Sequence, residues 1–153
     1  MTVREFIIFL LSGLVGTLGF ALLFRMRKAL IGWAVLSGTL TVAVYLVCTQ
    51  FFTHEFFQNL IPALVATLLS ELLARLTKSP ATQYITCSII PLVPGGKLYY
   101  TMHDFIVGNL ADCRIELRQT ARSAAGLAVG ILVVSVIIHQ LNFHKFKIDV
   151  ETE

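Results

Sequence analysis

A run of helix-breaking residues, Pro91, Pro94, Gly95 and Gly96, interrupts an apolar stretch of this 153-residue chain. The prolines lack amide protons, so the carbonyl groups four residues before each of them lose their helical partners. The glycines allow backbone conformations that other residues avoid, and the chain can restart as a new helix from Lys97 onward. In an apolar environment such unpaired backbone groups are tolerated only where they face protein or a water-filled cavity. The run therefore predicts a polar break.

The chemistry that suits this break is the binding of an anion. The first amides of the new helix point into the break, and the helix dipole favours negative charge there. Lys97 adds a full positive charge, and Tyr99, Tyr100 and Thr101 offer hydroxyl groups just beyond it. A small solute with a carboxylate group fits this arrangement. The plainer alternatives are a kink that serves helix packing alone and tyrosines that anchor the chain at the membrane interface.

Other ionisable residues within apolar stretches also need an explanation, because an unpaired charge is unfavourable there. Glu71 stands four residues before Arg75, so the two can pair along one face of a helix. Alternatively, Glu71 reaches the cavity, where it carries protons or opposes Lys97. Asp104 is open to the same choice between a cavity and an interfacial position.

Motifs for catalysis and metal binding are missing from the sequence. It has no HExxH, GxSxG, Walker or CxxC pattern, and no nucleophile stands beside a base. We therefore expect neither an enzyme nor a cofactor, and any transport would be driven by a gradient or a partner. The three cysteines are odd in number, so we expect free, buried thiols. We expect no metal site because the histidines lie on separate segments, at His54, His103, His139 and His144.

The segments that must position these residues are long and apolar. The chain is 56% hydrophobic and 14% charged, with a mean hydropathy of +0.79, which lies outside the range of ordinary soluble domains. The net charge of +3 sits in membrane-flanking loops, so we expect no nucleic-acid partner. We predict one all-α domain, residues 1–153, that forms a polytopic helix bundle in the lipid bilayer. Its five apolar elements cover residues 6–24, 29–49, 56–76, 81–102 and 123–138.

Two features of these elements concern their topology. The first element is too long for a secretory signal and lacks a cleavage site, so we expect it to be retained. Basic residues in the first and third loops indicate that these loops are cytoplasmic and that the N-terminus lies outside. The fourth element is broken or re-entrant, and the charge rule leaves both arrangements open. A full crossing would place Lys145 and Lys147 inside, and we favour it.

Small residues recur four positions apart, a spacing that favours close contact between membrane helices. Five elements are few for a complete transport pathway, so we expect assembly with another chain or with further copies of this one. The small residues form the pairs Ser12 and Gly16, Ala34 and Gly38, and Gly126 and Gly130.

Three sequence stretches carry a resemblance to a known family: SELLAR at residues 70–75, Ser79 with Pro80, and above all IIPLVPGGKLYYTM at residues 89–102. With them, the chain resembles the small second-half subunit of the threonine/serine exporter (ThrE-like) family, which includes a two-component dicarboxylate exporter. The likeness covers nearly the whole chain. At Lys97 the family pattern leads us to expect a small or apolar residue, so this position departs from it. The pattern falls on Glu71, Arg75, Pro80, Pro91, Pro94, Gly95, Gly96 and Tyr99.

The resemblance implies a subunit of a secondary transporter in a bacterial-type inner or plasma membrane. Such a transporter would export threonine/serine-type amino acids or small dicarboxylates such as succinate, and a separate larger subunit would resemble the family's N-terminal half. We expect alternating access, with the solute's carboxylate against the amides after Gly95 and with Glu71 as the coupling or gating acid. The alternative is a noncatalytic membrane scaffold or assembly subunit, in which the break would be packed and dry.

Overall fold

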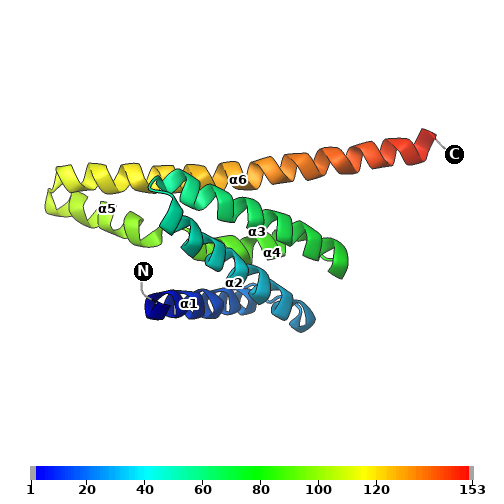
Figure 1. The fold of residues 1–153 in the computed structure, drawn as a ribbon, viewed down its shortest axis with the longest axis horizontal. Coiled ribbons are helices and arrows are strands. Elements are labelled where there is room, and N and C mark those ends of the chain that lie inside the picture. Colours follow the sequence, from blue (N-terminus) through cyan, green and yellow to red (C-terminus); the bar gives the residue numbers. More distant parts are fainter. Residues whose placement is uncertain (1–2, 152–153) are drawn as a thin grey trace.

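The computed structural model describes the backbone of residues 3–151 and the side chains of residues 4–140. Within this part of the chain every regular element is a helix, so the expected all-α bundle is confirmed (Figure 1). The elements are α1 (Val3–Leu23), α2 (Lys28–Phe51), α3 (Glu55–Thr77), α4 (Ala81–Ile89), the 3-10 turn η1 (Ile90–Leu92), α5 (Gly95–Val107) and α6 (Leu110–Glu151).

Among the residues that the structure describes, four helices are long and apolar enough to cross a bilayer, which confirms a multi-pass membrane protein. The helices α4 and α5 have 9 and 13 residues, so at 1.5 Å per residue they extend only about 14 Å and about 20 Å. Each is shorter than the hydrocarbon layer of about 30 Å. The expected fourth element is therefore two short helices joined through η1. The four longer spans are Arg4–Leu23, Lys28–Phe51, Glu55–Thr77 and Leu110–Gln140.

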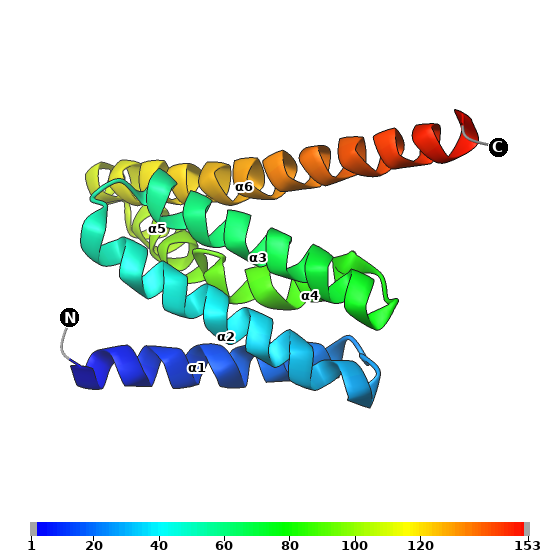
Figure 2. The ribbon, with the colours of Figure 1, turned by 45° about the vertical axis from the view of Figure 1, so that its right-hand side comes forward.

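Contacts at the two ends of α3 show that the fourth element traverses the bundle. Near the start of α4, the Tyr84 hydroxyl donates a hydrogen bond of 3.0 Å to the Thr77 hydroxyl at the end of α3. At the start of α5, Lys97 Nζ lies 3.7 Å from Glu55 Oε1 at the beginning of α3. The chain has thus passed from one end of α3 to the other, and α6 returns alongside α3 (Figures 1 and 2). The re-entrant alternative, in which the element turns back to its starting side, is not what the structure shows.

The last helix begins earlier than the sequence indicated. It starts at Leu110 rather than at residue 123, because residues 110–122 form an amphipathic, charged stretch that apolarity alone does not reveal. This stretch packs against α5, and the two project together beyond the end of α3 at which Glu55 lies (Figure 1). The fourth element likewise continues to Val107, past the expected boundary at residue 102.

Close contact through small residues is confirmed for two of the three pairs. A Cβ added at Gly38 would overlap the side chain of Thr17, so α1 and α2 touch there. A Cβ at Gly130 would lie 2.6 Å from the Cβ of Ala63 on α3. The Ser12 and Gly16 pair is different, because a Cβ at Gly16 would meet nothing within 4 Å. That pair lines a cavity instead of a helix contact.

Polar residues inside the bundle are largely satisfied by their own helices. The hydroxyls of Thr17, Thr41 and Thr67 each donate to the carbonyl four residues back, at 2.8–2.9 Å. A buried polar contact also joins α4 to α2, where the Ser88 hydroxyl donates to that of Ser37 at 3.1 Å. These bonds let polar side chains pack without water and fix α4, and hence the break, against α2. The cysteines are free and buried, as expected, at Cys48, Cys87 and Cys113.

The α3 and α6 contact predicts a stability effect. Gly130→Ala is expected to lower the free energy of unfolding by about 1–3 kcal/mol, because the added methyl group overpacks a contact between two helices. Gly19→Ala is the matched control, since a Cβ there meets nothing within 4 Å and the change favours helix formation. Thermal melting in detergent measures both. Equal melting temperatures for the two variants would contradict the tight α3 and α6 contact.

Candidate functional site

The interruption between α4 and α5 is short and closely defined. The 3-10 turn η1 follows α4 directly, and the Val93 amide donates to the Ile90 carbonyl at 3.1 Å. Val93 itself has an extended backbone, with φ −60° and ψ 128°. The Gly95 amide then donates to the Val93 carbonyl at 2.7 Å, and α5 begins. The chain therefore changes course within a few residues and restarts as a helix.

Gly95 and Gly96 contribute to this site by leaving space where a side chain would be, and not by an unusual backbone conformation. Among the glycines in the described residues only Gly108 has a positive φ, of 83°. Gly95 and Gly96 therefore do not use the left-handed backbone conformations that glycine allows. A Cβ at either position would meet nothing within 4 Å. The missing side chains leave open space beside the first turn of α5.

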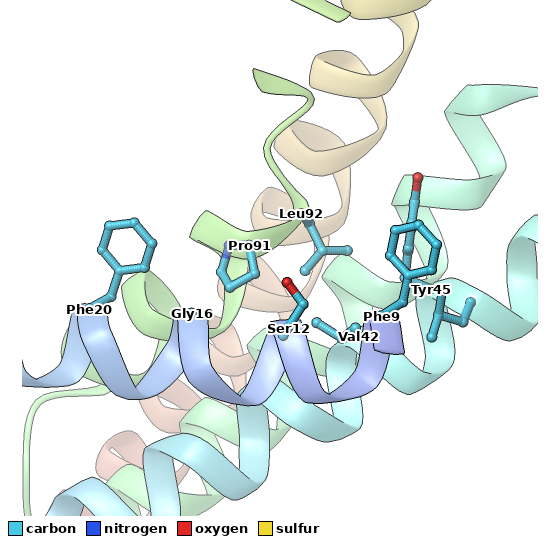
Figure 3. Close-up of a pocket in the computed structure, with 10 residues that line it drawn as sticks. Phe9, Ser12, Gly16, Phe20, Val42, Tyr45, Pro91 and Leu92 are labelled. Carbon is cyan, nitrogen blue, oxygen red and sulfur yellow. The ribbon is translucent and has the colours of Figure 1, made fainter. Parts of the chain in front are cut away.

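That open space belongs to a cavity of about 370 Å³. A second cavity of about 400 Å³ adjoins it between α1, α2 and η1 (Figure 3). The two share four lining residues, Phe9, Tyr45, Pro91 and Leu92. Together they offer room for a small metabolite beside the break. The remaining residues that line the first cavity are Asn59, Val93, Pro94, Gly95, Gly96, Lys97 and Ser123.

Several hydrogen-bonding groups around this cavity are available to a ligand. The first turn of α5 has no side-chain cap, and its only amides with partners are those of Gly95 and Leu98. The amides of Gly96 and Lys97 form no hydrogen bond within the described part of the chain. Ser123 lines the cavity with only 2% of its surface exposed. Its hydroxyl likewise has no hydrogen-bonding partner among residues 4–140. These groups can donate hydrogen bonds to an anionic oxygen.

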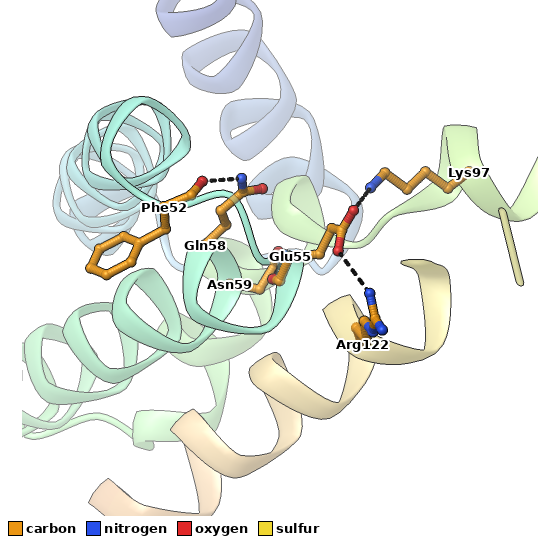
Figure 4. A network of polar contacts seen from close by, with 6 residues as sticks. All are labelled: Phe52, Glu55, Gln58, Asn59, Lys97 and Arg122. Carbon is orange, nitrogen blue, oxygen red and sulfur yellow. Dashed lines mark hydrogen bonds and ion pairs between the residues drawn. The ribbon is translucent and has the colours of Figure 1, made fainter. Parts of the chain in front are cut away.

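An ion-pair network adjoins the cavity at Lys97 (Figure 4). Glu55 Oε1 lies 3.7 Å from Lys97 Nζ, and Glu55 Oε2 lies 3.9 Å from Arg122 Nη1. The side chain of Asn59, which is 3% exposed and lines the cavity, donates to the Glu55 carbonyl at 2.8 Å. The network ties the starts of α3 and α5 to α6. Two cations and one carboxylate leave it a formal charge of +1.

Glu55 was not predicted from the sequence, because it lies just before the expected apolar element of residues 56–76. The available signal was its position just before an apolar run, where an acid stabilises the first turn of a helix. Glu71 lies 16 residues further along α3, which places it about 24 Å from Glu55 along the helix axis. The idea that Glu71 opposes Lys97 is therefore wrong. The pairing of Glu71 with Arg75 is also not formed, because Glu71 has no ion pair within the described residues.

The other sequence-predicted residues fall outside the two cavities. Thr101 is buried and donates to the Lys97 carbonyl at 2.8 Å, so its hydroxyl is engaged inside α5. Tyr99 and Tyr100 are exposed and pack edge to face, with ring centroids 5.5 Å apart. Asp104 contacts the neighbouring His103 at 3.2 Å. The structure thus brings together the predicted residues from Pro91 to Lys97 but not the later ones.

Comparison with known families gives this geometry a context. Residues 9–137 match the family described as Threonine/Serine exporter, ThrE. The chain belongs to the threonine/serine exporter family. Comparisons with curated proteins and with solved structures gave no match. All residues that line the two cavities of this ThrE-family protein, from Phe9 to Ser123, lie inside the matched range. The residues described include no group of three or more His, Cys, Asp or Glu side chains that could hold a metal ion.

Proposed function

We propose that the chain is the small subunit of a secondary transporter that exports small, carboxylate-bearing metabolites. These are amino acids of the threonine and serine type or small dicarboxylates such as succinate. Membership of an exporter family supports export. The observation that carries the solute class is the cavity against the start of α5, with its open amides, its lysine and its buried serine. An open cavity also favours a transporter over a scaffold, for which a packed break is expected.

The solute's carboxylate binds at the first turn of α5 in this proposal. The amides of Gly96 and Lys97 donate to it, and the helix dipole and the Lys97 ammonium group favour its negative charge. The buried Ser123 hydroxyl supplies a further donor from the α6 wall. Discontinuous helices bind anionic groups in this way in many secondary transporters.

Alternating access needs a site that opens to either end of the bundle in turn. The ion pairs of Glu55 lie at one end of α3, and Glu71 lies near the other, half-buried and about 24 Å away along the helix. We assign Glu71 the role of coupling or gating acid at its own end, with Arg75 beside it on the same helix. Transport would then use one acidic residue at each end of α3.

A larger second subunit completes the transporter in this proposal. Only 11% of the membrane span of α1 is buried, against 39% for α2 and for α3, and α1 lies at the edge of the bundle (Figure 2). Its uncovered apolar face suits a partner helix as well as lipid. A second copy of this chain is the alternative partner. We place the assembly in the inner or plasma membrane of a bacterial-type cell.

Efflux from whole cells tests this function. Cells that lack their own exporters are loaded with labelled threonine, serine or succinate, and express this chain alone, the larger subunit alone, or both. Efflux of at least one solute only when both chains are present is the expected result. Efflux with this chain alone would contradict the two-subunit arrangement but would still support an exporter function. No efflux of any solute, with both chains verified in the membrane, would contradict the proposed function.

Glu71→Gln is expected to reduce efflux strongly at unchanged membrane abundance. The amide keeps the size of the side chain but cannot carry a proton or a charge, and loss of such a group typically slows a proton-transfer step by about 100-fold or more. Glu116→Gln, in the part of α6 that projects with α5, is the control and is expected to leave efflux unchanged. Equal efflux by Glu71→Gln and the wild type would remove Glu71 from the mechanism.

A further inference from the structure

The carboxylate of Glu55 stands beside the same lysine that the proposed solute would use. Glu55 Oε1 is 3.7 Å from Lys97 Nζ, and Lys97 lines the cavity at the start of α5. The Glu55 side chain is only 16% exposed and is directed between Lys97 and Arg122 (Figure 4). A solute that places its carboxylate near Lys97 therefore brings the rest of its charge close to Glu55.

The ion pairs of Glu55 are loose. Their distances of 3.7 Å and 3.9 Å exceed the spacing of about 2.7–2.9 Å in tight charge-assisted hydrogen bonds. The two cations are also partly exposed, with 35% of the Lys97 side chain and 50% of the Arg122 side chain accessible. Partly exposed pairs of this kind contribute little to stability. A solute can therefore separate Glu55 from Lys97 at small cost.

We propose that Glu55 selects zwitterionic amino acids over dianionic carboxylates, by pairing with the solute's ammonium group while Lys97 takes its carboxylate. This inference rests on the proposed function and adds a specificity residue to it. An amino acid carries both charges on neighbouring groups, so it can insert between Lys97 and Glu55 and satisfy each. A dicarboxylate offers only negative charge, and its second carboxylate meets the like charge of Glu55, which disfavours binding.

Asn59 and Ser123 fit this arrangement from the two walls of the cavity. The Asn59 side chain donates to the Glu55 carbonyl at 2.8 Å and fixes the first turn of α3 from which Glu55 projects. Ser123 follows Arg122 on α6 and lines the cavity, with 2% of its surface exposed. The acid is therefore held in place by its backbone, while its side-chain contacts remain exchangeable.

The experiment compares a zwitterion with a dianion in the same transporter. Efflux of labelled threonine and succinate is measured in the combination of chains that supports transport. The half-saturation constant of each transported solute is determined. If only one of the two solutes is transported, the other is added as a competitor and its inhibition constant is determined instead. Glu55→Gln is expected to raise the constant for threonine and lower that for succinate, each by about three- to tenfold for the loss of one nearby charge. A purely structural role would shift both constants in the same direction.

Two further variants keep the test decisive. Lys97→Gln is expected to raise both constants, because each solute loses the cation that pairs with its carboxylate. This variant can still be measured if Glu55→Gln does not reach the membrane. Glu116→Gln, which removes an acid outside the cavity, is expected to change neither constant. The assignment of Glu55 is overturned if the two constants do not move in opposite directions in Glu55→Gln. It is also overturned if they do not rise in Lys97→Gln. A wild-type transporter that moves none of threonine, serine and succinate would instead contradict the proposed function itself.

Discussion

Gly96→Leu is expected to abolish most of the efflux while leaving the fold intact. A Cβ at position 96 meets nothing within 4 Å, and leucine is a good helix former, so α5 can accept it. The side chain would extend into the space beside the open amides and keep a carboxylate away from them. Loss of one charged hydrogen bond, about 1.5–3 kcal/mol, corresponds to a reduction of about 10- to 100-fold. Initial rates of solute efflux at matched membrane abundance measure this effect.

Gly32→Leu is the matched control for this prediction. Gly32 also has open space around its Cβ position, but it lies exposed on α2 and lines neither cavity. The control is expected to transport as the wild type does. If Gly96→Leu also transports at the wild-type rate, the solute does not approach the start of α5, and the proposed binding mode is wrong.

Ser88→Leu is expected to destabilise the bundle severely. Ser88 is fully buried, and its hydroxyl donates to Ser37 across the α2 and α4 contact at 3.1 Å. Leucine adds volume where none is free, at about 1–3 kcal/mol, and it leaves the Ser37 hydroxyl unpaired, at about 1–3 kcal/mol more. The sum is a large share of the stability of a small domain, about 5–15 kcal/mol. The yield of folded protein and its melting temperature in detergent measure the effect.

Thr86→Leu separates this effect from a general sensitivity of α4. Thr86 lies two residues earlier on the exposed side of the helix, and its hydroxyl donates only to the Thr82 carbonyl. We expect this variant to melt near the wild-type temperature. If Ser88→Leu melted at the same temperature as Thr86→Leu, the contact between α2 and α4 would be looser than in the structure.

The sequence predicted the membrane spans well because each long apolar run carries its own signal. The early start of α6 was missed, since residues 110–122 are amphipathic and pack against α5 rather than crossing lipid. The direction of the fourth element was left open because basic residues flank it on both sides in the sequence. Contacts with Thr77 and Glu55, at opposite ends of α3, decide the direction.

The candidate site was predicted in part. The segment from Pro91 to Lys97 lines a cavity, as its helix-breaking residues indicated. The partner of Lys97 was not found, because sequence spacing does not say which end of α3 faces the break, and Glu71 was considered where Glu55 is the contact. Ser123 carried no local signal, since a serine in an apolar helix is common and its place beside the cavity depends on packing.

Reconstitution into proteoliposomes tests the central claim most directly, since no other transporter is then present. This chain and its proposed larger subunit are purified, inserted together into lipid vesicles, and supplied with labelled threonine, serine and succinate under an imposed proton gradient and without one. The account predicts saturable movement of at least one of these solutes above that of protein-free vesicles, and its loss in Gly96→Leu. Movement no greater than in empty vesicles for all three solutes, with both chains folded and inserted, would contradict it.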